Sequence, residues 1–131
     1  MTERIYSFTY NRDYLPPFPA LEIELSLPGR PQPTVSLSAL VDTGADVTLL
    51  PLNALTSIGA RFINDARVSG LFGGRESVGI YAVTIRISHQ QIHAVRVAGV
   101  PTLTDAILGR DVLGQMIITL NGPAETLELH E

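Results

Sequence analysis

The sequence contains no cysteine, no lysine and no tryptophan. Without cysteine the chain can form no disulfide, use no thiolate nucleophile and build no cysteine-ligated zinc site. All nine of its basic residues are arginines, so a Schiff-base lysine, a P-loop lysine and a lysine general base are also excluded. These absences narrow the candidate chemistry, chiefly toward carboxylates.

Positive charge and long apolar runs are scarce as well. Thirteen acidic residues against nine basic ones give a net charge of −4, which argues against binding nucleic acid through a phosphate-neutralising surface. No stretch approaches the roughly 18 consecutive apolar residues of a membrane span, and residues 1–4 do not begin a signal-peptide core. We expect a soluble, cytoplasmic chain with no membrane partner, either alone or as a domain of a larger precursor.

The length of 131 residues and a content of 45% apolar and 17% charged residues predict one globular domain over residues 1–131. Eleven glycines and nine prolines spread along the chain disfavour long helices and favour many short strands. Apolar residues alternate with polar ones over 21–27 and 35–41, on either side of a turn at 28–31, which predicts a hairpin. The fold class is therefore all-β with one or two short helices. Further strands are expected at 5–10, 78–87, 92–97, 117–120 and 126–129, another β-rich arm from Val68, and helices at 51–58 and 110–115.

The most informative segment runs from Ala39 to Pro51. An apolar strand leads directly into Asp42, and Gly44 allows the backbone to turn tightly just after it. A carboxylate at the end of a buried strand is costly to ionise without partners. Asp-Thr-Gly alone is also ordinary turn chemistry, but the apolar flanks and two distant motifs favour a functional site.

Three motifs together resemble the retropepsin family, the single-domain aspartic proteases of retroviruses and their cellular and bacterial relatives. Residues 40–46 (Leu-Val-Asp-Thr-Gly-Ala-Asp) are similar to the catalytic loop, and residues 70–74 (Gly-Leu-Phe-Gly-Gly) to a glycine-rich flap tip. Residues 107–113 (Ile-Leu-Gly-Arg-Asp-Val-Leu) resemble the segment that ends in the helix of that family. The resemblance spans residues 20–120 and implies a closed β-barrel of the acid-protease type, a flap hairpin, and terminal strands at a dimer interface.

Aspartic protease chemistry needs two carboxylates that share one proton. The chain has one Asp-Thr-Gly, and Asp111 lacks that turn signature, so the second carboxylate has to come from another copy. The resemblance therefore implies a homodimer with Asp42, Thr43 and Gly44 as catalytic residues, and with the Thr43 hydroxyls interlocked across the two-fold axis.

The resemblance also implies roles around this centre. The expected substrate-binding residues are Ala45, Asp46, Gly70, Leu71, Phe72, Gly73 and Ile107. The expected structural supports are Leu108, Gly109 and Arg110, with Arg110 paired to Asp46. The glycines of the flap lower the cost of bending, so that the flap can open for substrate and close over it.

The sequence thus predicts an aspartic endopeptidase that cleaves extended peptide or protein segments with apolar residues near the scissile bond. The alternative is a retropepsin-fold binding or dimerisation module with little or no proteolytic activity. Residues 1–18 are expected to form an N-terminal extension with an interface strand, and 121–131 a C-terminal interface strand. No cofactor or metal is expected, since His89 and His93 fall around a strand turn without an acidic ligand nearby.

Overall fold

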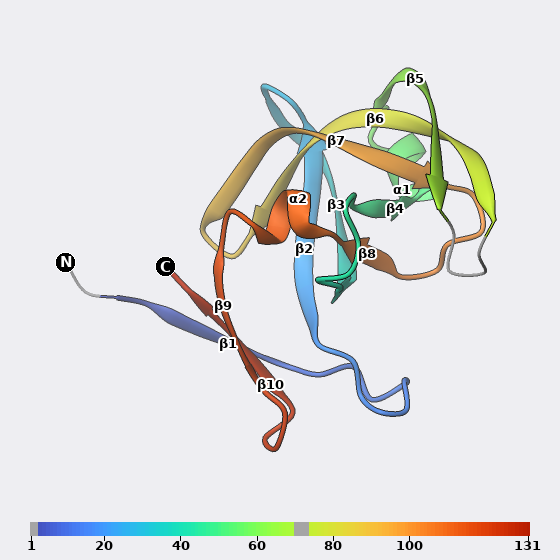
Figure 1. The fold of residues 1–131 in the computed structure, drawn as a ribbon. Helices are drawn as coiled ribbons and strands as arrows, with labels where there is room; N and C mark the ends of the chain where they lie inside the picture. Colours follow the sequence, from blue (N-terminus) through green and yellow to red (C-terminus); the bar gives the residue numbers. More distant parts are fainter. Residues whose placement is uncertain (1–2, 70–73) are drawn as a thin grey trace.

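The computed structural model describes residues 3–69 and 74–131. Within them the chain forms ten strands and two short helices, as Figure 1 shows. The larger sheet consists of β2 (Ala20–Leu27), β3 (Arg30–Val41), β4 (Leu49–Pro51), β5 (Arg61–Ser69), β6 (Arg75–Ile87), β7 (Gln90–Val100) and β8 (Ala106–Leu108). The terminal sheet consists of β1 (Ile5–Thr9), β9 (Ile117–Asn121) and β10 (Thr126–His130), and the helices are α1 (Leu52–Ser57) and α2 (Arg110–Leu113).

The larger sheet closes on itself. Its strand order is β2-β3-β8-β4-β7-β6-β5, and an additional antiparallel pairing of β2 with β6 joins β2 to the far side of this order. Six strands therefore form a ring, with β5 attached outside it to β6. The parallel pairing of β3 with β8 and the antiparallel pairing of β4 with β8 bring the strand ends around Asp42 together. The expected all-β class is confirmed.

The alternating hairpin predicted from the sequence forms the centre of the core. Leu21, Ile23 and Leu25 of β2 are at most 2% exposed, whereas Glu22 on the opposite face is exposed. Burying an aliphatic side chain of this size contributes roughly 1.5–3 kcal/mol. The hydrophobic effect therefore fixes the register of the hairpin, because a shift of one residue would bring the polar face inward.

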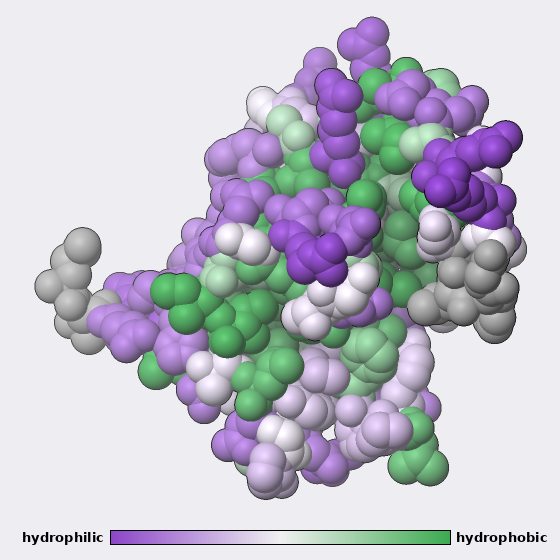
Figure 2. Space-filling model, viewed as in Figure 1, coloured by the Kyte–Doolittle hydropathy of each residue, from purple (hydrophilic) through white to green (hydrophobic). Residues whose placement is uncertain are grey.

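The terminal sheet is built within one chain, in the order β1-β10-β9. Leu127 and Leu129 of β10 are fully buried and belong to the same core as the barrel. The outer strands carry exposed apolar side chains: Ile5 is 51% exposed, Ile117 70% and Leu120 50%. Figure 2 shows hydrophobic surface at the lower left, over this sheet.

Several elements differ in extent from the sequence-based expectation. The arm expected from Val68 begins earlier in the structure, at Arg61. The sequence did not reveal this start because β5 has little of the apolar alternation that marks a half-buried strand. Its first five residues are all exposed. The second helix ends at Leu113 rather than at residue 115, and Leu49–Pro51 forms a short strand before α1. In the described part of the chain, neither helix has the length needed to cross a membrane.

Replacing a core leucine should destabilise the protein far more than replacing an exposed one. We expect Leu25→Ala, at a position that is 0% exposed, to lower the free energy of unfolding by about 2–5 kcal/mol. Leu15→Ala makes the same chemical change at a position that is 98% exposed and should stay within about 0.5 kcal/mol of the wild type. Urea unfolding at one protein concentration measures both, and equal losses would contradict this account of the core.

Candidate active site

Asp42 lies where β3 ends against β8. Its backbone N–H donates to the carbonyl oxygen of Leu108 at 3.0 Å, which extends the parallel pairing of the two strands by one bond. Its Oδ1 accepts the backbone N–H of Gly44 at 2.9 Å. The side chain is half-buried. One carboxylate oxygen is therefore held by the loop itself, and the group is still accessible from outside.

Arg110 holds this loop at three points. Its guanidinium donates from Nη1 to the carbonyl oxygen of Thr43 at 2.8 Å and from Nη2 to the carboxylate of Asp46. Its own backbone N–H donates to the carbonyl oxygen of Ala45 at 2.8 Å. Both charged side chains are more than half exposed, so the ion pair alone contributes little. The bonds to main-chain oxygens give Arg110 its importance, since they fix the backbone next to Asp42.

A buried network beneath the loop involves two residues that the sequence analysis did not assign to the site. Thr48 is 0% exposed. Its hydroxyl donates to Oδ1 of Asp111 at 2.8 Å, and its backbone N–H donates to Oδ2 at 3.1 Å. The same hydroxyl oxygen accepts the backbone N–H of Gly109 at 3.1 Å. Asp111, considered from sequence only as a second catalytic carboxylate, instead fastens the loop to the first turn of α2.

Gly109 is required by the close approach of two chain segments. A Cβ atom at this position would lie 2.8 Å from the backbone carbon of Val47 and 2.9 Å from its carbonyl oxygen. Any side chain would therefore force the loop away from α2. The preceding Leu108 is fully buried and supports the strand below Asp42.

One cavity beside Asp42 has a volume of about 350 Å³. Three segments line it: the connection between β1 and β2, the end of β3, and the approach to β8. Its lining residues are Tyr14, Phe18, Leu40, Asp42, Thr102, Leu103, Thr104, Asp105 and Ile107. Ile107 was expected here. Tyr14 and Phe18 were not, because residues 1–18 were assigned only to an extension and an interface strand, and Asp105 lies just before the recognised motif at 107–113.

The wall of this cavity is ordered by a contact between distant residues. The Tyr14 hydroxyl donates to Oδ2 of Asp105 at 2.5 Å, and the Tyr14 ring meets the Phe18 ring edge to face at a centroid distance of 5.5 Å. The hydrogen bond to the Asp105 carboxylate, with burial and the negative charges of Asp105 and Asp13, raises the pKa of Tyr14. Tyr14 therefore remains a protonated donor at neutral pH.

A second cavity, of about 320 Å³, lies beside the other part of the Asp42 loop. Gly44, Ala45 and Asp46 line it together with Val68 and Ser69 of β5, among others. The arms of the expected flap hairpin are paired up to Ser69 and Arg75. The expected flap residues Gly70, Leu71, Phe72 and Gly73 lie outside the described residues.

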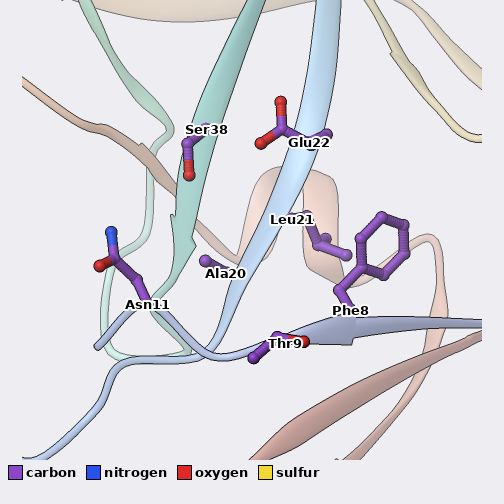
Figure 3. Close-up of a pocket in the computed structure, with 7 residues that line it drawn as sticks. All are labelled: Phe8, Thr9, Asn11, Ala20, Leu21, Glu22 and Ser38. Atoms are coloured by element: carbon purple, nitrogen blue, oxygen red, sulfur yellow. The ribbon is translucent and has the colours of Figure 1, made fainter. Parts of the chain in front are cut away.

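A further cavity, of about 270 Å³, lies between β1 and the β2–β3 hairpin. Figure 3 shows Phe8 of β1 close to Leu21, and Glu22 and Ser38 on the neighbouring strands β2 and β3. It contains none of the expected site residues. Over residues 3–69 and 74–131 there is also no cluster of three or more acidic or histidine side chains placed to hold a metal ion.

The family model for the retroviral aspartyl protease matches residues 18–121. The chain belongs to this family. A search of curated protein sequences found no match.

Solved structures resemble the chain in fold. The EIAV protease in complex with the inhibitor HBY-793 is 24% identical, with a TM-score of 0.63 over 82% of this chain and 93% of that one. A retropepsin-like aspartic protease from Rickettsia conorii is 15% identical, with a TM-score of 0.64 over 98% of this chain and 93% of that one. The foamy viral protease-reverse transcriptase is 18% identical, with a TM-score of 0.53 over 74% of this chain and 12% of that one. The retropepsin fold expected from the sequence is confirmed.

Two buried threonines give a matched test of the network beneath the loop. We expect Thr48→Val to destabilise the protein by about 1–3 kcal/mol, because it leaves the Gly109 N–H without an acceptor and removes one of the hydrogen bonds to the Asp111 carboxylate. The hydroxyl of Thr84 is buried without a hydrogen bond among the described residues, so Thr84→Val should be neutral or stabilising. Thermal unfolding measures the stability of both variants. A Thr48→Val protein as stable as the wild type would contradict the anchoring role of this network.

Proposed function

We propose that this protein is an aspartic endopeptidase that works as a homodimer, with Asp42 of each copy forming one catalytic dyad. The observation that carries the proposal is the placement of Asp42. Its carboxylate is half-buried at the end of β3, bound on Oδ1 by Gly44, and beside a cavity that can receive a substrate side chain. Membership of the retroviral aspartyl protease family supports the same chemistry.

In this mechanism the two Asp42 carboxylates share one proton, because like charges about 3 Å apart cannot both ionise. The ionised carboxylate removes a proton from water as the water oxygen attacks the carbonyl carbon of the substrate. The protonated carboxyl gives its proton to the carbonyl oxygen, which yields a tetrahedral diol. The diol then collapses and its C–N bond breaks. The carboxyl that took the water proton gives a proton to the leaving nitrogen, and a diol hydroxyl returns its proton to the other carboxylate, which restores the shared proton. The pair titrates as a unit with two macroscopic pKa values.

The dimer is proposed because one chain supplies one Asp-Thr-Gly. A two-fold axis next to Asp42 brings the same loop of both copies together, and Thr43, which is exposed in the single chain, then meets its counterpart. The terminal sheet supports this arrangement. Among the described residues β9 pairs on one side only, and its exposed Ile117 and Leu120 give a partner strand both main-chain groups and apolar surface to bind.

The substrate class follows from the walls of the cleft. Cavities on both sides of the Asp42 loop suit an extended peptide that places successive side chains in separate pockets. Leu40, Ile107 and Val68 give these cavities apolar surface, in keeping with apolar residues near the scissile bond. The substrate-binding role expected for Gly70, Leu71, Phe72 and Gly73 stays a prediction. The intact Asp42 loop favours the enzyme over a binding or dimerisation module without activity.

Replacing the catalytic carboxylate is the direct test of the mechanism. Asp42→Asn should reduce peptide cleavage to background, because an amide can neither accept a proton from water nor share one across the dyad. The variant should fold and dimerise like the wild type, since the amide oxygen can still accept the Gly44 N–H. Cleavage of a peptide library followed by mass spectrometry, with sedimentation to check the dimer, measures both properties. Near-normal cleavage by the variant would contradict the proposed mechanism.

The interface assigned to β9 can be tested with a charge on its exposed face. Ile117→Glu should weaken the dimer by tenfold or more, because a buried unpaired charge is costly, and activity should then fall steeply on dilution. Phe62→Glu introduces the same charge at another exposed apolar position, on β5 at 52% exposure, and should leave the dimer intact. Sedimentation equilibrium of both variants provides the comparison. Equal weakening by both, or by neither, would remove β9 from the interface.

A further inference from the structure

The cavity beside Asp42 contains a second carboxylate that the dyad mechanism does not use. Asp105 lies just before β8 and is half-buried in the cavity wall. Its Oδ2 accepts the Tyr14 hydroxyl. Within residues 3–69 and 74–131, no other group donates a hydrogen bond to this carboxylate and no arginine pairs with it. Asp105 therefore keeps acceptor capacity toward the cavity.

The rest of the cavity wall differs from Asp105 in polarity, because much of it is apolar. Phe18, Leu40 and Ile107 contribute apolar surface, and none of the described residues that line the cavity is basic. A side chain that fits such a space combines an apolar stem with a cationic end, because the stem covers the hydrocarbon walls and the charge meets the carboxylate. Arginine and lysine have this construction. A purely apolar side chain would leave the free lone pairs of Asp105 covered without a donor.

We propose that Asp105 makes this cavity a subsite for an arginine or lysine side chain of the substrate, next to the scissile bond. The inference rests on the proposed protease function and narrows its substrate class, because it places a basic residue where the apolar walls of the cavity alone would favour an apolar one. In the dimer the cavity occurs twice, once on each side of the dyad.

Tyr14 has a positioning role in this subsite. Its ring is fixed against Phe18, and its hydroxyl holds Oδ2 of Asp105, so the other carboxylate oxygen is the one left for the substrate. The raised pKa of Tyr14 keeps the hydroxyl protonated, so it donates to Asp105 at neutral pH. Tyr14→Phe should therefore leave the charge of the subsite unchanged but reduce its discrimination.

The test uses three peptides that are identical except at one residue beside the scissile bond, which is arginine, citrulline or norleucine. Citrulline keeps the shape of arginine without its charge. We expect wild-type kcat/KM to be about tenfold higher for the arginine peptide than for the citrulline peptide, the effect of one charge-assisted hydrogen bond. Asp105→Asn should bring this ratio close to one. Asp65→Asn removes the same charge from an exposed site on β5 and should keep the wild-type ratio. Each of the two positions beside the scissile bond is tested in turn.

Two further measurements make the result decisive. The arginine preference of the wild type should shrink as salt is raised, a readout that holds even if Asp105→Asn fails to fold. Binding of the same peptides to the inactive Asp42→Asn protein, followed by fluorescence anisotropy, separates this inference from the mechanism. Equal binding and cleavage of the arginine and citrulline peptides, or an unchanged ratio in Asp105→Asn, would overturn the subsite. A wild-type protein that binds the arginine peptide preferentially but cleaves none would contradict the protease function and leave the subsite standing.

Discussion

The geometry of the site depends on the attachment of the Asp42 loop to the first turn of α2. The loop is short, partly exposed and buries little apolar surface, so the hydrophobic effect alone cannot fix it. Hydrogen bonds through Thr48, Asp111 and Arg110 do so instead, and they require the close backbone approach that Gly109 allows. Because several of these bonds end on main-chain atoms, they position the backbone that carries the carboxylate.

The same arrangement fits the proposed homodimer, in which each chain supplies half of the active site. In the single protomer Asp42 is half-buried and Thr43 is exposed, so an ionised carboxylate there retains much of its hydration. In the proposed dimer, assembly removes that hydration and brings two carboxylates together. Sharing a proton offsets the repulsion that results. Under this proposal, a carboxylate that costs little to ionise in the protomer becomes reactive only where two protomers meet.

The elements of the fold that follow local sequence patterns could be predicted, whereas contacts between residues far apart in the sequence could not. The alternation of Leu21, Ile23 and Leu25 predicted the central hairpin, and the retropepsin motifs predicted the fold around Asp42. The start of β5 was predicted too far along the sequence, because its exposed first half shows no alternation of buried and exposed residues. Tyr14 and Asp105 are 91 residues apart, and Thr48 and Asp111 are 63 apart. Such contacts form only when the barrel closes, although an acidic residue in the first turn of a predicted helix was a signal that could have marked Asp111.

The pairing of β1 with β10 brings the two ends of the fold together. Arg4 and Glu131 exchange two backbone hydrogen bonds, of 2.9 and 2.8 Å, and β1 and β10 lie side by side in Figure 1. A short peptide linker can therefore join the ends into a circular backbone without rearranging the sheet. Covalent closure restricts the unfolded chain more than the folded one, so a cyclised protein should resist heat better. The turn at Pro28–Gly29, between β2 and β3, is then a natural place to open new termini in a circular permutant.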